Sequence, residues 1–171
     1  MAGSRTVFDA FVAANAESLL RTAHLLTMDA GEAEDLVQEC LVLLVQRWHR
    51  VGAMDQPAAY ARRVLVNLAV RGSSKRSRLR AELETDGVDR AADSQAVELT
   101  EDRDELWVAL RRLTTRQRAV LVLRYFNDFS EAQTAQILGC SPGTVSSTTS
   151  RSLARLRELM GPTVRERSDQ R

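Results

Sequence analysis

The spacing of apolar residues predicts helices along most of the chain. Apolar side chains recur at three- and four-residue steps over about residues 5–27 and 31–49 and again from Pro57, a stripe that buries one face of a helix. Asp29 to Gly31 separates the first two helices, and Gly72 to Ser74 is expected to loosen the third. No run alternates apolar and polar residues as a half-buried strand would, so the expected fold class is all-α. The residues expected in this first core are Phe8, Phe11, Val12, Leu19, Leu20, Ala23, Leu26, Leu36, Val37, Cys40, Leu41, Leu44, Trp48, Ala61, Val64, Leu65, Leu68 and Ala69.

A second run of helical stripes begins near residue 104. Thr114 is placed to cap a helix, and Asn127 and Asp128 are residue types that turn a chain. The apolar residues of this part are Leu106, Val108, Leu110, Leu113, Val120, Leu121, Leu123 and Tyr125.

The segment from Ser130 to Met160 predicts a helix-turn-helix. Ser130 suits the start of a short helix, and Gly139 is the residue type that ends one in the left-handed conformation. Ser141 and Pro142 suit the start of a longer helix. This arrangement is typical of DNA-binding proteins. Its expected buried residues are Ala135, Ile137, Leu138, Val145, Thr149, Ser152, Leu153 and Leu156.

The outer face of that longer helix favours DNA binding. Short hydroxyls permit close approach to DNA, and an arginine binds phosphate or guanine. No acidic residue occurs from Ala132 to Arg157. The alternative is a helical hairpin with a solvated Ser/Thr-rich face, which helix propensity disfavours. The residues of this face are Ser146, Ser147, Ser150, Arg151 and Arg155.

The formal charge of +1, from 24 basic and 23 acidic residues, conceals blocks of opposite sign. Residues 1–56 hold four basic and eight acidic residues, and 57–80 hold seven basic and none acidic. Residues 81–105 hold two basic and ten acidic residues, and 106–171 hold eleven and five. Such blocks usually mark interaction surfaces or disordered segments.

These patterns divide the 171 residues into two small helical domains, at 1–77 and 104–162. A flexible acidic linker is expected at 78–103, helical in part near its ends, and a tail at 163–171.

Several classes of protein are disfavoured. Cys40 and Cys140 stand far apart, and His24 and His49 stand alone, which argues against a disulfide framework or a structural zinc site. The longest apolar run, Cys40 to Val45, is far shorter than the roughly 20 residues of a membrane span. The N-terminus has no signal-peptide pattern, so we expect a cytoplasmic protein without cofactor or metal.

Four motifs occur in a familiar order along the chain. They are Glu34 to Glu39 (EDLVQE), Ala61 to Ala69 (ARRVLVNLA), Leu113 to Arg124 (LTTRQRAVLVLR) and Leu138 to Val145 (LGCSPGTV). Together they resemble the extracytoplasmic-function (ECF) sigma factors of bacterial RNA polymerase, most closely the SigE-like actinobacterial branch. The resemblance covers about residues 5–160. It implies two helical domains, sigma region 2 and sigma region 4.

The resemblance implies roles for region 2. In the family, the second helix docks on the clamp helices of the polymerase β′ subunit, which corresponds here to Glu34, Asp35, Gln38 and Glu39. By residue type alone, these residues also suit a solvated helix start, whereas a carboxylate metal site lacks further ligands nearby.

The third helix and the loop before it read the −10 element in the family, and the loop at 51–56 is the candidate pocket for an extruded base. The uninterrupted basic block supports this role because cations neutralise phosphates, although a solvated basic helix end has the same composition. Tyr60, where relatives often carry Trp, suits the core better than a stacking role. The matching positions are Arg62, Arg63, Asn67 and Arg71.

Region 4 reads the −35 element in the family. This chain departs from the family at Ser146, where relatives usually carry Lys or Arg, so we expect weaker and less salt-sensitive −35 binding. The matching positions are Arg124, Thr144, Ser146, Ser147, Ser150, Arg151 and Arg155.

The resemblance therefore implies a dissociable specificity subunit of RNA polymerase with no catalytic residue of its own. Its expected partners are core polymerase, through the β′ clamp helices and the β flap, and promoter DNA. An anti-sigma factor is a further candidate, and the free chain is expected to be monomeric. The alternatives are a stand-alone helix-turn-helix regulator, which would normally dimerise, and a small metalloenzyme. The latter would use Glu32, Glu34, Asp35 and Glu39.

Overall fold

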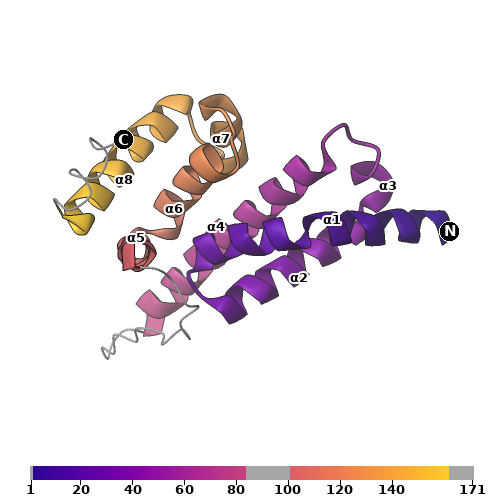
Figure 1. Ribbon diagram of the computed structural model, residues 1–171, viewed down its shortest axis with the longest axis horizontal. Helices are drawn as coiled ribbons and strands as arrows, with labels where there is room; N and C mark the ends of the chain where they lie inside the picture. The colour runs from indigo at the N-terminus through magenta and orange to yellow at the C-terminus, as the bar shows by residue number, and fades with distance from the viewer. Residues whose placement is uncertain (1, 84–100, 162–171) are drawn as a thin grey trace. The chain divides into compact units, whose positions relative to one another are not determined.

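The computed structural model describes residues 2–83 and 101–161, with side chains described over 5–75 and 105–161. The chain divides into two compact units, Met1–Asp93 and Ser94–Arg171 (Figure 1). Every regular element within the described ranges is helical, which confirms the predicted fold class. Residues 84–100 of the expected linker and the expected tail at 163–171 lie outside the described residues.

The first unit contains α1 (Ala2–Thr27), α2 (Ala30–Gln46), α3 (Trp48–Val51) and α4 (Pro57–Leu83). Helices α1, α2 and α4 lie side by side in Figure 1, and each contacts the other two. The predicted stripes meet between them, with Leu26, Leu44 and Leu65 fully buried. The predicted helix over 31–49 is divided at Arg47, after which α3 begins as a separate turn.

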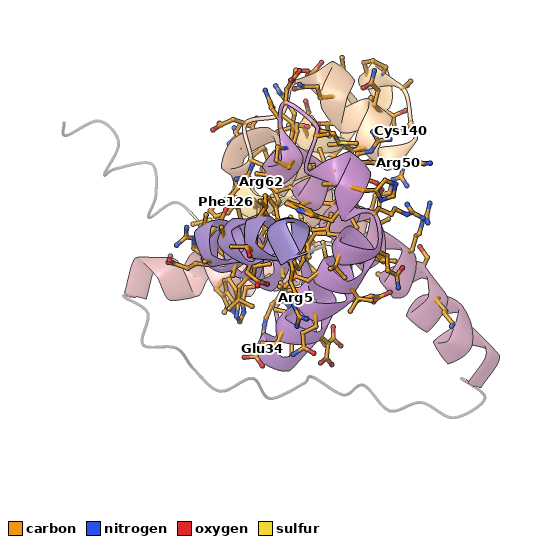
Figure 2. The ribbon with its side chains drawn as sticks, turned by 90° about the vertical axis from the view of Figure 1, so that its right-hand side faces the viewer. Arg5, Glu34, Arg50, Arg62, Phe126 and Cys140 are labelled. Carbon is orange, nitrogen blue, oxygen red and sulfur yellow. The ribbon has the colours of Figure 1, made fainter. Side chains whose placement is uncertain are left out.

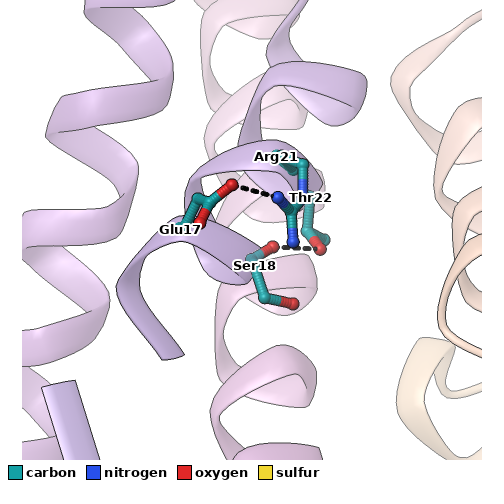
Figure 3. A network of polar contacts seen from close by, with 4 residues as sticks. All are labelled: Glu17, Ser18, Arg21 and Thr22. Carbon is teal, nitrogen blue, oxygen red and sulfur yellow. Dashed lines mark hydrogen bonds and ion pairs between the residues drawn. The ribbon is translucent and has the colours of Figure 1, made fainter. Parts of the chain in front are cut away.

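The α1–α2 connection is as short as its sequence indicates. Met28 adopts a left-handed conformation with φ of 61°. The Asp29 carboxylate then caps α2 by accepting from the backbone N–H of Glu32 at 2.8 Å. Figure 3 shows two polar contacts within the last turns of α1. Arg21 and Glu17 form an exposed ion pair, and the Thr22 hydroxyl donates to the Ser18 carbonyl at 3.0 Å.

The expected loosening at Gly72 to Ser74 is wrong, because α4 continues through these residues to Leu83. A glycine inside a helix costs only about 1 kcal/mol relative to alanine. The surrounding residues offset that cost, and the Ser74 hydroxyl donates to the Val70 carbonyl at 3.1 Å. The basic block therefore lies on one continuous helix.

The second unit contains α5 (Glu101–Arg111), α6 (Thr115–Leu121), the π-helical turn η1 (Val122–Phe126), α7 (Glu131–Leu138) and α8 (Pro142–Met160). One cluster of buried residues joins α5, α6 and α8 through Ala109, Leu121 and Leu156. A second cluster joins α6, α7 and α8 through Val120, Ala135 and Val145. Helix α8 therefore packs on every α-helix of its unit.

Three residues expected in this core are exposed. Leu106 and Val108 project outward because the buried side of α5 carries Ala109, and Leu113 is buried just after the helix ends. Tyr125 is 60% exposed because η1 shifts the register at the end of α6. None of the described helices is long and apolar enough to cross a membrane.

Arg118 is a buried charge that the sequence did not single out. Its guanidinium donates to the carbonyls of Leu113 at 2.6 Å and Leu110 at 3.3 Å. The Leu110 carbonyl lies in the last turn of α5 and the Leu113 carbonyl just beyond it, where intrahelical partners run out. Arg118 thereby joins α5 to α6.

Candidate nucleic-acid interface

Capping interactions define both helices of the predicted helix-turn-helix. Ser130 forms a reciprocal capping box with Gln133, with hydrogen bonds of 3.1 and 2.8 Å. Gly139 ends α7 at φ of 63°, a conformation in which a β-carbon is strained. The Ser141 hydroxyl caps α8 by accepting from the Thr144 N–H at 3.1 Å, and Pro142 follows at the first helical position. The structure confirms this set of predictions.

The inner face of α8 consists of apolar residues and internally bonded hydroxyls. Val145 and Leu156 are buried. The Thr149 hydroxyl donates to the Val145 carbonyl at 2.8 Å, and the Ser152 hydroxyl donates to the Thr148 carbonyl at 2.7 Å. Two of the many hydroxyls in this helix are therefore structural, and those of the opposite face remain to be explained.

The outer face of α8 centres on Ser147, Ser150 and Arg151, all exposed. Arg151 lies along the helix surface, where its Nε donates to the Ser147 carbonyl at 3.2 Å and its second terminal nitrogen contacts the Ser147 hydroxyl at 3.3 Å. That hydroxyl in turn donates to the Thr144 carbonyl at 3.2 Å. The guanidinium is thus oriented while keeping further N–H groups for a ligand.

Ser146 and Arg155 project from opposite flanks of this face, because nine residues correspond to a rotation of about 180°. Both are exposed, but Arg155 is paired with Glu158 at 3.2 Å. Thr144 is also exposed, with its hydroxyl 2.9 Å from that of Ser141. Arg151 is therefore the central cation of the face, and Arg155 would have to leave an ion pair to bind phosphate.

Arg124 is placed differently from the other predicted −35 residues. It lies half-buried in η1, and its guanidinium donates to the Phe129 carbonyl at 2.6 Å, just before α7 begins. Its Nε is buried without a partner among the described residues. Arg124 therefore stabilises the turn that leads into the helix-turn-helix.

In the first unit, α4 brings together three of the four predicted −10 residues. Arg63, Asn67 and Arg71 follow one another at four-residue steps and share a face, with both arginines exposed. Arg62 lies about 100° around the helix, half-buried beside the core. Tyr60 is also half-buried.

The predicted polymerase-binding residues Glu34, Asp35, Gln38 and Glu39 are all exposed on α2. Figure 2 shows Glu34 at the lower end of the first unit, whereas Arg50 and Arg62 lie in its upper part. Glu34 therefore lies apart from these two arginines. The sequence analysis missed that Val42 and Val45, about half exposed, continue this face of α2.

Cys40 is buried between α2 and α4, with its sulfur 3.5 Å from the Ala61 carbonyl. Burial, reinforced by the neighbouring Glu39 charge, raises the pKa of this thiol to about 12. Among the described residues, no group of three His, Cys, Asp or Glu side chains is arranged to hold a metal ion.

Comparison with known proteins agrees with this geometry. The Sigma-70 region 2 family matches residues 11–79, and the Sigma-70, region 4 family matches residues 103–156. The RNA polymerase sigma-E factor of Streptomyces avermitilis is 38% identical over 151 residues, which cover 88% of this chain and 83% of that protein.

Less similar proteins also match most of the chain. The ECF RNA polymerase sigma factor SigL of Mycobacterium tuberculosis is 33% identical over 136 residues, covering 78% of this chain and 77% of that protein. The sigma factor RpoE of Bartonella quintana, solved in complex with the anti-sigma factor NepR, superposes with a TM-score of 0.69 at 27% identity, covering 90% of this chain and 96% of that one. The chain belongs to the ECF sigma factors of the sigma-70 family, which bind core RNA polymerase and direct promoter-specific initiation of transcription.

Proposed function

We propose that the outer face of α8 reads the −35 element of a promoter in the major groove. The observation that carries this proposal is the oriented guanidinium of Arg151 between the exposed hydroxyls of Ser147 and Ser150. An arginine presented in this way suits bidentate binding of guanine or phosphate. Thr144, Ser146 and Arg155 would contact the flanking backbone, and Arg124 would act by supporting the turn before α7.

We further propose that the −10 element binds the first unit along the exposed face of α4. Arg63 and Arg71 neutralise phosphates of the separated strand, and Asn67 between them hydrogen-bonds a base edge or sugar. Arg62 lies at the margin of this face and contributes less. The carrying observation is that α4 is continuous, so its cations lie at regular steps along one helix.

The exposed polar residues of α2 dock on the β′ clamp helices, and the second unit reaches the β flap. Core polymerase would then hold both DNA-binding faces at once. Two weak contacts on one scaffold reinforce each other through effective concentration, so the free chain binds promoter DNA weakly. It acts as a monomer in the cytoplasm and performs no catalysis of its own.

The RpoE relative was solved with an anti-sigma factor. We extend this mode of regulation to the present chain, in which an anti-sigma protein would cover surfaces that core polymerase needs. Competition between a candidate anti-sigma protein and core polymerase for the purified chain tests this. A candidate that binds without displacing polymerase contradicts this mode of inhibition.

Run-off transcription with purified core polymerase on genomic fragments tests the proposal as a whole. Promoter-specific transcripts are expected only when the chain is added. A double variant, Glu34→Ala with Asp35→Ala, should weaken core binding about tenfold, as expected for loss of roughly 1.4 kcal/mol. Glu17→Ala, which removes an exposed acid of α1, is the matched control. The proposal fails if a control sigma factor is active and this chain yields no specific transcript.

A further inference from the structure

The loop Gly52–Gln56, which connects α3 to α4, is exposed along its length, and its first residues are held by backbone hydrogen bonds. The Gly52 N–H donates to the Trp48 carbonyl at 2.8 Å, and the Ala53 N–H donates to the Arg50 carbonyl at 3.3 Å. The Met54 N–H donates to the Val51 carbonyl at 3.1 Å. The loop therefore continues the turn of α3, and its position depends on where α3 is fixed.

Helix α3 is fixed by a cluster of three aromatic rings. The Trp48 indole is buried, with its ring centre 5.0 Å from that of Phe8 in an edge-on arrangement and 4.9 Å from that of Phe11. Both phenylalanines belong to α1, and Figure 1 shows α3 beside the N-terminal half of that helix. The indole cannot move without disturbing α1, because packed interiors leave little free volume.

Gly52 lies directly against this indole. A β-carbon at residue 52 would lie 3.1 Å from Trp48 Cε2, 3.2 Å from its Nε1 and 3.1 Å from its carbonyl oxygen. Its φ of −66° is available to any residue, so space rather than backbone conformation requires the glycine. Any side chain at residue 52 would displace either the ring or the loop by a few tenths of an ångström.

We propose that Trp48 and Gly52 are positioning residues that set the loop Gly52–Gln56 against an unstacked base of the −10 element. The loop carries the chemistry for this contact. Met54 is 42% exposed and offers an apolar surface for the base, while the polar groups of Asp55 and Gln56 suit its edge. The inference rests on the −10 role proposed for the first unit. It adds that the Trp48–Gly52 contact influences which base is accepted, because this contact sets the position of the loop.

Gly52→Ala in the full-length chain tests this inference. We expect core binding within twofold of the wild type, and promoter opening about tenfold slower, as for loss of one base contact. The relative preference among bases at the −10 positions should also change. Gly31→Ala is the matched control, because a β-carbon there meets only Asp29 Oδ1 at an ordinary 3.5 Å.

A double variant separates positioning from general destabilisation. Trp48→Phe removes the ring atoms nearest Gly52, so it should lower thermal stability on its own but restore part of the opening lost in Gly52→Ala. The inference is overturned if Gly52→Ala opens promoters with wild-type rate and base preference. It is also overturned if Trp48→Phe only adds to the defect. Arg63→Ala in the same assay separates failure of this inference from failure of the proposed −10 role. If Arg63→Ala slows promoter opening and Gly52→Ala does not, α4 keeps its −10 role and only the role of the loop is overturned.

Discussion

Helices α4 and α8 both present a polar face outward, but the two faces differ in chemistry. The face of α4 carries long cations at four-residue steps, with Arg63 and Arg71 exposed. The face of α8 carries hydroxyls around the single arginine Arg151, while Arg155 is already paired with Glu158. The electrostatic attraction between a long cationic side chain and a phosphate reaches over several ångströms and is screened by salt. A short hydroxyl interacts only when the helix approaches the DNA closely. We therefore expect α4 to bind mainly by charge and α8 mainly by fit.

The same contrast explains how a formal charge of +1 is compatible with DNA binding. The basic residues of 57–80 all belong to α4, while the acidic residues of 1–56 include the exposed ones of α2. Charges that cancel in the sum are therefore carried by different helices.

The largest expected effect comes from removing charge from α4. The double variant Arg63→Ala, Arg71→Ala should lower initiation about 100-fold, because each charged hydrogen bond contributes roughly 1.5 kcal/mol or more. The salt dependence of promoter binding by holoenzyme should also weaken, by about 1.4 units in slope for two phosphates of a single strand. Run-off assays over a salt series measure both. Arg21→Ala, at an exposed arginine paired on α1, is the control, and an equal loss there would contradict the assignment.

A smaller effect is expected on α8. Arg151→Ala should lower initiation about tenfold on promoters that depend on the −35 element, the cost of one good base contact. Core binding and initiation from −10-only templates should be unchanged. Arg157→Ala, at an exposed arginine further along the same helix, controls for general loss of charge. Equal defects in the two variants would refute a specific role for Arg151.

Adding charge to α8 should make it resemble α4. Ser146→Lys introduces one further phosphate contact, so affinity for −35 DNA should rise a few-fold and its salt slope should steepen by about 0.9. Ser146→Ala, which removes only the hydroxyl, should change the slope little. An unchanged slope in the lysine variant would show that residue 146 does not face the DNA backbone.

The smallest effect distinguishes the two cysteines, one in each unit. With the pKa of its thiol near 12, buried Cys40 has a thiolate fraction of roughly one in ten thousand at pH 8. Half-buried Cys140 should therefore account for alkylation of the native chain, giving one modified thiol by mass spectrometry and two after unfolding. Rapid labelling of Cys40 in the folded protein would contradict its burial.

Cys40 also predicts the direction of a pH effect on stability. The unfolded thiol loses its proton near its ordinary pKa of 9.0, whereas the folded thiol keeps it to about pH 12. The unfolded state therefore binds fewer protons between these values, and the free energy of unfolding falls as pH rises through that window. Cys40→Ala should remove this part of the dependence in denaturant titrations.

The sequence by itself determined the features that depend on neighbouring residues. Thr114, Ser130 and Ser141 cap their helices as predicted, because the bonds involved reach only two or three residues along the chain. Gly139 ends α7 for the same local reason. The helical class and the inner face of α8 follow from the spacing of apolar side chains, which one helix determines alone.

Only the tertiary structure decided which of several candidates face outward. Arg62 and Arg63 are adjacent in sequence, yet packing of α4 on α1 and α2 leaves the first half-buried and the second exposed. Leu106 is exposed and Arg118 is buried because their environments depend on how α5 meets α6 and α8. Gly52 shows the same limit, because its close approach to the indole requires the aromatic cluster between α1 and α3, which the order of residues does not reveal.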